Sequence, residues 1–140
     1  GLWTLDATDD VVSCTWGGTW RMPTKNEWSE LQEHCVWTWT DDYNQTGVAG
    51  YVVASKSSDA SLFLPAAGCR YANQINEKGV HGYYWSSSLF TNHSSYRGSA
   101  YQLQFFQAFV KSNWNYTRYY GSSVRGVCPS TTTKSAGITQ

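Results

Sequence analysis

The segment Trp16-Gly-Gly-Thr-Trp-Arg-Met-Pro-Thr-Lys-Asn-Glu-Trp-Ser-Glu-Leu31 contains the clearest structural signal in the chain. Thr24 and Glu27 fit a capping box, in which the threonine hydroxyl accepts the Glu27 amide and the glutamate accepts the Thr24 amide. Behind this start, apolar residues recur at helical spacing at Trp28, Leu31 and Cys35. The pattern predicts an amphipathic helix of about three turns that ends near Cys35.

Runs of β-branched and aromatic residues after this helix predict short antiparallel strands. They lie at 36–40, 50–55, 61–65, 83–88, 100–106 and 123–128. Segments 73–82, 90–99 and 107–120 are polar and predicted to be loops. Residues 1–15 allow a short helix, a turn or a strand. The predicted class is α+β, with one or two helices, short antiparallel strands and long loops late in the chain.

The strand predicted at 100–106 has two different faces. Tyr101, Leu103 and Phe105 share one face, which we expect in the core. Gln102, Gln104 and Phe106 share the other, which we expect to be wetter. Tyr84 and Trp85 in the preceding strand are also expected in the core.

The bulk composition favours a single domain that binds other molecules. The 140 residues include ten basic and ten acidic ones, giving a formal net charge of +0. This balance argues against a nucleic-acid partner, which normally needs a clustered basic surface. Charged residues make up only 14% and aromatic residues 16%, which is typical of secreted or surface-displayed β-rich modules. We expect a domain at 1–129 and a Ser/Thr-rich tail or linker at 130–140, with no direct membrane insertion.

The four cysteines form an even set: Cys14, Cys35, Cys69 and Cys128. Two disulfides in an oxidising compartment and four buried free thiols are both compatible with this set. Three pairings are possible, and the sequence does not choose among them. No pair has the C-x-x-C spacing of a zinc or redox motif.

Catalytic and metal-binding patterns are absent from the sequence. The three histidines are scattered, no Ser-His-Asp order or phosphate loop occurs, and Asp pairs such as Asp9–Asp10 fit turns. No carboxylate side chain lies between Lys78 and Gln140, which argues against a calcium site in the late loops. We therefore predict no enzymatic activity, no metal and no cofactor.

Several blocks resemble the hallmark of the Fibrobacter succinogenes major paralogous domain. They are Trp16–Leu31, Trp37–Thr40, Leu64–Gly68, Tyr84–Ser87 and Ser123–Arg125, spread in order over about residues 9–129. The family is common in surface and secreted proteins of Bacteroidetes and their phages. The resemblance implies a C-type lectin-like fold of the formylglycine-generating-enzyme branch, with paired N- and C-terminal strands and a ligand-binding face built from late loops.

The chain departs from this family in two ways. Only about 15 residues precede the Trp-Gly-Gly block, where the family has a longer portion with its first strand. The tail after Cys128 exceeds the usual end. The activity of the related enzyme, formylglycine generation, requires a closely placed cysteine pair late in the domain. Only Cys128 lies there, so we do not expect that activity.

Some members of this fold are variable proteins of diversity-generating retroelements. In those proteins, positions with adenine-rich, Asn-type codons near the C-terminus are mutated to vary binding. The matching segment here is about 102–120, which holds Asn113 and Asn115 among several aromatic residues. The resemblance therefore implies one variant of a diversified repertoire.

These observations predict a display domain that binds a protein or glycan on another cell or particle, without calcium, through loops 89–99 and 106–120. Rigid aromatic residues beside Ser, Asn and Arg are typical of such surfaces. The predicted ligand-binding residues are Phe90, Asn92, His93, Tyr96, Arg97, Phe106, Phe109, Lys111, Asn113, Trp114, Asn115, Tyr116 and Tyr119. The expected location is secreted, on the cell surface or on a phage particle. The alternative is a structural or adhesin module of a surface fibre or phage tail, with oligomers possible through a parent protein.

Overall fold

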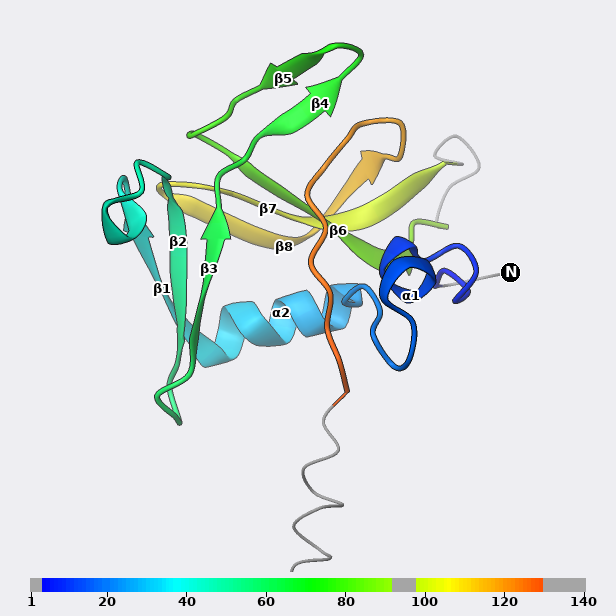
Figure 1. The fold of residues 1–140 in the computed structure, drawn as a ribbon, viewed down its shortest axis with the longest axis horizontal. Helices are drawn as coiled ribbons and strands as arrows, with labels where there is room; N and C mark the ends of the chain where they lie inside the picture. Colours follow the sequence, from blue (N-terminus) through cyan, green and yellow to red (C-terminus); the bar gives the residue numbers. More distant parts are fainter. Residues whose placement is uncertain (1–3, 92–97, 130–140) are drawn as a thin grey trace, which may run out of the picture.

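A computed structural model of the chain describes residues 4–91 and 98–129. Two helices are present, α1 (Val11–Trp16) and α2 (Lys25–His34), with a short 3-10 helix, η1 (Tyr43–Gln45). The strands are β1 (Cys35–Thr40), β2 (Gly50–Ser55), β3 (Ser61–Pro65), β4 (Cys69–Tyr71), β5 (Gln74–Asn76), β6 (Gly82–Leu89), β7 (Ser99–Phe106) and β8 (Phe109–Thr117). They form three antiparallel sheets in the orders β1-β2-β3, β4-β5 and β6-β7-β8 (Figure 1). The predicted α+β class is confirmed.

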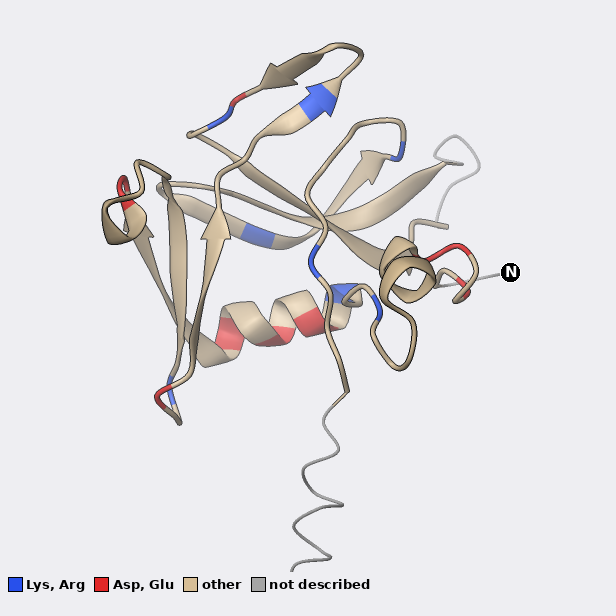
Figure 2. Ribbon diagram, viewed as in Figure 1, with Lys and Arg blue, Asp and Glu red and all other residues tan. Residues whose placement is uncertain are grey.

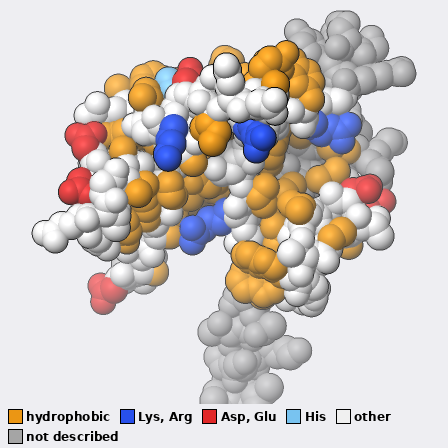
Figure 3. Space-filling model, turned by 45° about the horizontal axis from the view of Figure 1, so that its top comes forward, with side chains coloured by type: hydrophobic (Ala, Val, Ile, Leu, Met, Phe, Trp, Pro, Cys, Tyr) orange, Lys and Arg blue, Asp and Glu red, His pale blue; other side chains and the backbone are white. Residues whose placement is uncertain are grey.

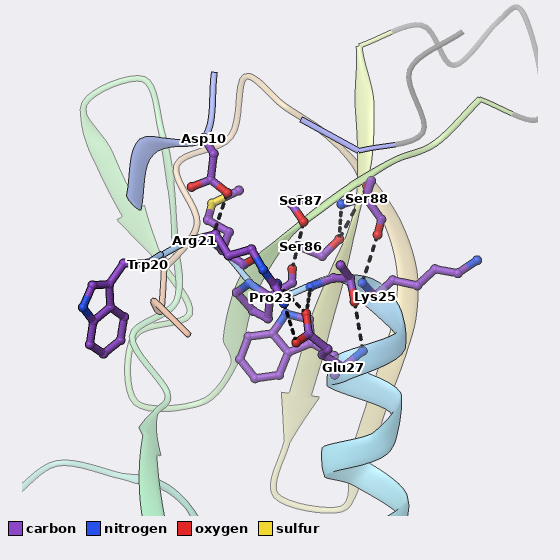
Figure 4. Close-up of polar contacts among 12 residues, drawn as sticks. Asp10, Trp20, Arg21, Pro23, Lys25, Glu27, Ser86, Ser87 and Ser88 are labelled. Carbon is purple, nitrogen blue, oxygen red and sulfur yellow. Dashed lines mark hydrogen bonds and ion pairs between the residues drawn. The ribbon is translucent and has the colours of Figure 1, made fainter. Parts of the chain in front are cut away.

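The capping box predicted at α2 is present and is reinforced by an arginine. Thr24 Oγ1 accepts the Glu27 amide at 3.2 Å, and Glu27 Oε1 accepts the Thr24 amide at 2.8 Å. The Arg21 guanidinium donates to both oxygens of Glu27, at 2.7 and 3.0 Å (Figure 4). Such a two-point contact fixes the geometry as well as the charge. Arg21 therefore fixes how the chain enters α2.

The segment before α2 is fastened to both α1 and the sheet. Asp10 is buried, caps α1 through the Val12 and Ser13 amides, and also accepts the Met22 amide at 2.9 Å. On the other side, the Pro23 carbonyl accepts the Ser87 amide at 2.8 Å (Figure 4). The sequence left residues 1–15 undecided, because the second partner of Asp10 lies twelve residues away in the chain.

Glu27 should make stability depend on pH. Hydrogen bonding from Arg21 holds the pKa of the Glu27 carboxyl below its usual value. This contribution is complete above the unfolded-state pKa of about 4.3 and is lost as pH falls through the lower folded-state pKa. We expect Glu27→Gln to flatten the fall in melting temperature between about pH 6 and about pH 3. Glu33→Gln, an exposed change on the same helix, is the control, and an equal effect of both would contradict the assignment.

The core lies between α2, the β1–β3 sheet and one face of the β6–β8 sheet. Its buried members include Trp28, Tyr51, Val53, Leu64, Tyr84, Leu103 and Phe105. Figure 1 shows α2 lying along one side of the β6–β8 sheet. Ser29 of α2 is 2.9 Å from the Ser112 hydroxyl of β8, which marks the face of β8 that points to the helix.

Several strand and burial predictions are wrong. Segment 107–120 contains strand β8 and segment 73–82 contains β5. Segment 123–128, predicted as a strand, makes only isolated bridges, through Ser123 to Tyr84 and Val127 to Arg21. Gln102 is fully buried, and Tyr101 and Trp85 are only partly buried. Paired terminal strands are not found among the described residues, and the predicted tail at 130–140 lies outside them.

The four cysteines are free thiols, so neither sequence alternative is correct as stated. Cys69 is buried, Cys35 is half-buried, and Cys14 and Cys128 are exposed. Cys14 Sγ lies 3.1 Å from the Thr8 carbonyl, whereas Cys128 Sγ lies 3.2 Å from the Thr19 hydroxyl. Each exposed thiol therefore has a separate polar neighbour.

Candidate binding surface

The β7–β8 hairpin sorts its side chains onto two faces. Phe105 pairs with Val110 on the core face, because both pack in the cluster beneath the sheet. Side chains alternate along a strand, so the next pair, Phe106 and Phe109, lies on the opposite, outer face. The Tyr51 hydroxyl, at 3.0 Å from the Phe106 carbonyl and 2.8 Å from that of Gln107, holds the turn in place.

A register shift keeps later β8 residues on this outer face. Gln104 pairs with Lys111 and Gln102 with Trp114, so β8 has one extra residue between these pairs. Tyr116, opposite Ala100, continues the same face. The outer face of β8 thus presents rings at both ends and a lysine between them.

Eight rings on or beside the outer face form a continuous series, here called the aromatic row. In order, its members are Phe109, Phe106, His81, Tyr83, Tyr116, Tyr120, Tyr119 and Tyr71. Consecutive ring centroids are 4.6 to 6.1 Å apart, within the range of favourable aromatic pairs. The row joins the β7–β8 turn to β6, to the turn after β8 and to β4.

The ends of the aromatic row are its most exposed parts. Phe106 and Phe109 are 38% and 39% exposed at one end, and Tyr119 and Tyr71 are 67% and 50% exposed at the other. Figure 3, in which the top of the Figure 1 view is turned forward, shows hydrophobic side chains exposed in groups. Contiguous exposed apolar groups mark interaction sites more often than single exposed residues do.

Trp114 and Lys111 extend the surface beside the row. The Lys111 Nζ atom lies 4.5 Å from the Trp114 ring centroid, which is cation–π geometry. Trp114 remains 41% exposed. Both side chains are therefore ordered by each other while one ring face or edge stays open to solvent.

The Glu77 carboxylate, near the middle of the aromatic row, is hydrogen-bonded to a tyrosine. The Tyr83 hydroxyl donates to Glu77 Oε2, and His81 Nδ1 lies 3.8 Å from the same oxygen. Burial, together with this hydrogen bond, raises the pKa of Tyr83, and burial also raises that of Tyr116. Both phenols are consequently neutral at physiological pH.

Charge is distributed unevenly between the two sides of the β6–β8 sheet. Residues 78–140 contain six Lys and Arg and no Asp or Glu. Figure 2 shows Asp and Glu on α2, while β6, β7 and β8 carry none. Figure 3, with the top of the Figure 1 view turned forward, shows Lys and Arg side chains between the hydrophobic groups and an acidic side chain beside a histidine at the upper edge. Lys and Arg therefore predominate in this later part of the chain, and the carboxylate beside the outer face is Glu77, which is hydrogen-bonded to Tyr83.

The structure brings some predicted site residues together and separates others. Those on the outer face are Phe106, Phe109, Lys111, Trp114 and Tyr116, joined by Tyr119 from the following turn. Asn113 is exposed at the register shift. Asn115 pairs with Tyr101 on the α2 side, and Phe90 packs against Tyr101 at 5.3 Å. Asn92, His93, Tyr96 and Arg97 lie outside the described residues.

Four members of the aromatic row were missed by sequence reasoning: Tyr71, His81, Tyr83 and Tyr120. Of these, Tyr83 was the easiest to predict from the sequence, because strand alternation places it on the face opposite its buried neighbour Tyr84. His81 could then have been included as well, because it directly precedes β6 and lies two residues before Tyr83. Tyr71 and Tyr120 carry no local signal, since their contact joins β4 to a turn 49 residues later.

Comparisons with known proteins identify no relative. No protein-family model, curated protein or solved structure matches the chain. Within the described ranges, no group of three or more His, Cys, Asp and Glu side chains could hold a metal ion. No helix in the same ranges is long and apolar enough to cross a membrane.

Proposed function

We propose that this chain is a ligand-binding domain that uses the aromatic row and the Lys111–Trp114 pair as its binding surface. The observation that supports this most strongly is the exposure of rings at both ends of a continuous series that runs from the β7–β8 turn across β6 to the turn after β8 and to β4. Rigid aromatic side chains provide large contact area at low entropic cost. A macromolecular ligand, protein or glycan, fits a surface of this extent.

The proposal is for binding without catalysis. The side chains on this face are aromatic rings, amides and one lysine, and the nearby Glu77 carboxylate accepts a hydrogen bond from Tyr83. Acid–base and nucleophilic chemistry needs titratable groups held in reach of a substrate, whereas Tyr83, which joins Glu77 to the row, is buried. Calcium is not required, because ring stacking and hydrogen bonds supply the contacts.

We further propose a C-type lectin-like domain of the Fibrobacter succinogenes major paralogous type, displayed on a secreted, cell-surface or phage protein. The support is the ordered set of sequence blocks, beginning with the capping box at Thr24 and Glu27. Placement of Trp114 and Tyr116 on an outer strand face also suits a surface diversified by a retroelement. A reverse-transcriptase gene beside a near-copy of the segment for 83–128, differing mainly at adenines, would establish diversification.

The direct test combines a binding panel with a surface variant. The wild-type chain is screened against immobilised glycans and purified proteins, and binders are remeasured with Phe106→Ser/Phe109→Ser/Trp114→Ser. We expect binding to fall at least about a hundredfold, or about 2.7 kcal/mol. The variant should still fold, because the three rings are 38%, 39% and 41% exposed and lie outside the core cluster. The matched control is Val11→Ser/Val36→Ser/Val48→Ser, three exposed apolar residues elsewhere. Equal loss in both variants, or an unfolded surface variant, would refute this surface.

A second exposed apolar group favours the structural-module alternative. Trp16 and Trp20 are 59% and 41% exposed and form a T-shaped pair at 5.2 Å, and Trp16 packs beside Gly126. Such a group could rest on a neighbouring domain of a fibre. A stable oligomer in solution whose interface buries the aromatic row would favour this alternative over ligand binding.

A further inference from the structure

We propose that the ligand of the aromatic row is a carboxylated polysaccharide. This inference rests on the proposed function and narrows it to one ligand class. It depends on three properties of the surface: the continuity of the rings, the hydroxyl groups among them and the sign of the charge around them.

The continuity of the row suits a chain-like ligand with flat apolar faces. Its contacts run from Phe109 at the β7–β8 turn to Tyr71 on β4 without a break larger than 6.1 Å between ring centroids. Each ring touches the next, so the row is a strip of packed rings. Sugar rings carry C–H faces that pack on aromatic rings, as other apolar surfaces do. Tyr83, in the middle of the row, is only 8% exposed. Sugars could therefore lie on the exposed rings at the two ends, while the polymer chain between them crosses the buried middle.

Polar groups at the edges of the rings suit the hydroxyl groups of sugars. Tyr71, Tyr116, Tyr119 and Tyr120 contribute phenol rings to the row. The hydroxyls of Tyr116 and Tyr119 hydrogen-bond with Tyr120, and a phenol that makes one hydrogen bond can still accept or donate another. The Asn113 side chain is exposed at the register shift of β8. The strip therefore combines apolar contact with hydrogen-bonding tips.

The charge around the strip selects for an anionic ligand. Lys111 lies on the outer face of β8, and Arg70 and Arg118 are exposed neighbours of Tyr71 and Tyr119 in the chain. The carboxylates of α2, by contrast, lie on the other side of the sheet (Figure 2). The carboxylate beside the row, Glu77, accepts a hydrogen bond from the Tyr83 hydroxyl. Charge complementarity raises the association rate and excludes wrong partners. Arginine is suited to carboxylates, because its two N–H groups match both oxygens.

Nucleic acid and protein fit these observations less well. A nucleic acid binds through many phosphate contacts, whereas the cations here are few and the net charge is +0. Protein interfaces concentrate their binding energy in a few separate anchors that fill pockets of the partner. The rings of the row instead touch one another along its length.

The experiment compares one polymer with and without its charge. Binding of the intact chain is measured by calorimetry with polygalacturonate fragments and with the same fragments methyl-esterified; alginate fragments, a neutral glucan, poly-L-glutamate and single-stranded poly(dT) complete the panel. We expect polygalacturonate and alginate to bind, and esterification or the neutral glucan to reduce affinity about tenfold or more. Lys111→Met should reduce affinity for the charged polymer only, while Lys56→Met, at an exposed site on the β2–β3 turn, should leave it unchanged.

Any other outcome overturns the carboxylated polysaccharide as the ligand. Each such outcome also shows whether the proposed binding surface itself still stands. Equal affinity for charged and esterified polymer means that the carboxylates are not recognised, although a ring-dependent glycan site remains. Tighter binding of poly-L-glutamate or poly(dT) that requires Phe106, Phe109 and Trp114 assigns the same surface to another ligand class. Failure of every polymer to bind refutes the carboxylated polysaccharide, while the broader panel still decides whether the surface binds at all.

Discussion

Phe105→Ala is expected to lower the free energy of unfolding by about 3–5 kcal/mol. Phe105 is fully buried at the centre of the core, where its ring centroid lies 5.2 Å from that of Tyr51 and 6.0 Å from that of Tyr84. The rings of Trp37 and Trp39 lie 6.5 Å away. Alanine would leave a cavity that these large, mutually packed rings cannot close. Urea unfolding followed by tryptophan fluorescence measures the change.

The adjacent residue in the same strand is the matched control. Phe106 has the same side chain but is 38% exposed on the outer face. Phe106→Ala should therefore cost about 1 kcal/mol or less, the value of its contacts with Phe109 and His81. Similar losses from both substitutions would contradict the assignment of the two faces of β7.

Gly82→Ala is expected to destabilise the protein by about 1–3 kcal/mol, through overpacking. Gly82 pairs with Phe105 across β6 and β7, and a Cβ atom on Gly82 would overlap the Phe105 ring. The ring has no free space to move into, since it is fully buried among other aromatic residues. The urea midpoint of Gly82→Ala, compared with wild type, measures this cost.

A double substitution separates this overlap from a general loss of strand stability. Phe105→Leu removes ring atoms that a Cβ on Gly82 would meet. Gly82→Ala/Phe105→Leu should thus be more stable than the sum of the single effects by about 0.5–3 kcal/mol. Val12→Ala, buried outside this core cluster, should add to Gly82→Ala without coupling. Strict additivity with Phe105→Leu would exclude the proposed overlap.

The elements that the sequence predicted correctly are those set by local patterns. The start of α2 was predictable because Thr24 and Glu27 are three residues apart and satisfy each other. The hairpin of β1 and β2 was predictable from alternating β-branched and aromatic residues. In both cases the deciding interactions lie within one segment.

Strand β8 could not be recognised in this way. Only one of its faces contacts the core, through Val110 and Ser112, and its sequence from Lys111 to Thr117 is polar and aromatic in a loop-like mixture. The register shift after Lys111 also breaks the two-residue period that marks a strand. Pairing with β7, whose core residues Leu103 and Phe105 are fully buried, decides the conformation.

The binding surface was predictable in composition but not in shape. Phe106, Phe109 and Trp114 stood out as aromatic residues in a polar segment. Whether they lie near Tyr83 depends on which of two adjacent tyrosines in β6 points away from the core, and Tyr84 is the one in the core cluster. Whether the row extends to Tyr71 depends on the bridge between Arg70 and Gly121, which brings β4 close to the turn after β8.

The central claim is that ligand binds to the outer face of the β6–β8 sheet. It is tested most directly by NMR of the aromatic side chains during titration with the tightest member of the binding panel. We expect the ring signals of Phe106, Phe109, Trp114 and Tyr119 to shift, and those of the buried Trp28 and Phe105 to stay in place. Shifts confined to Trp16 and Trp20, or absent from the aromatic row at saturation, would contradict the claim.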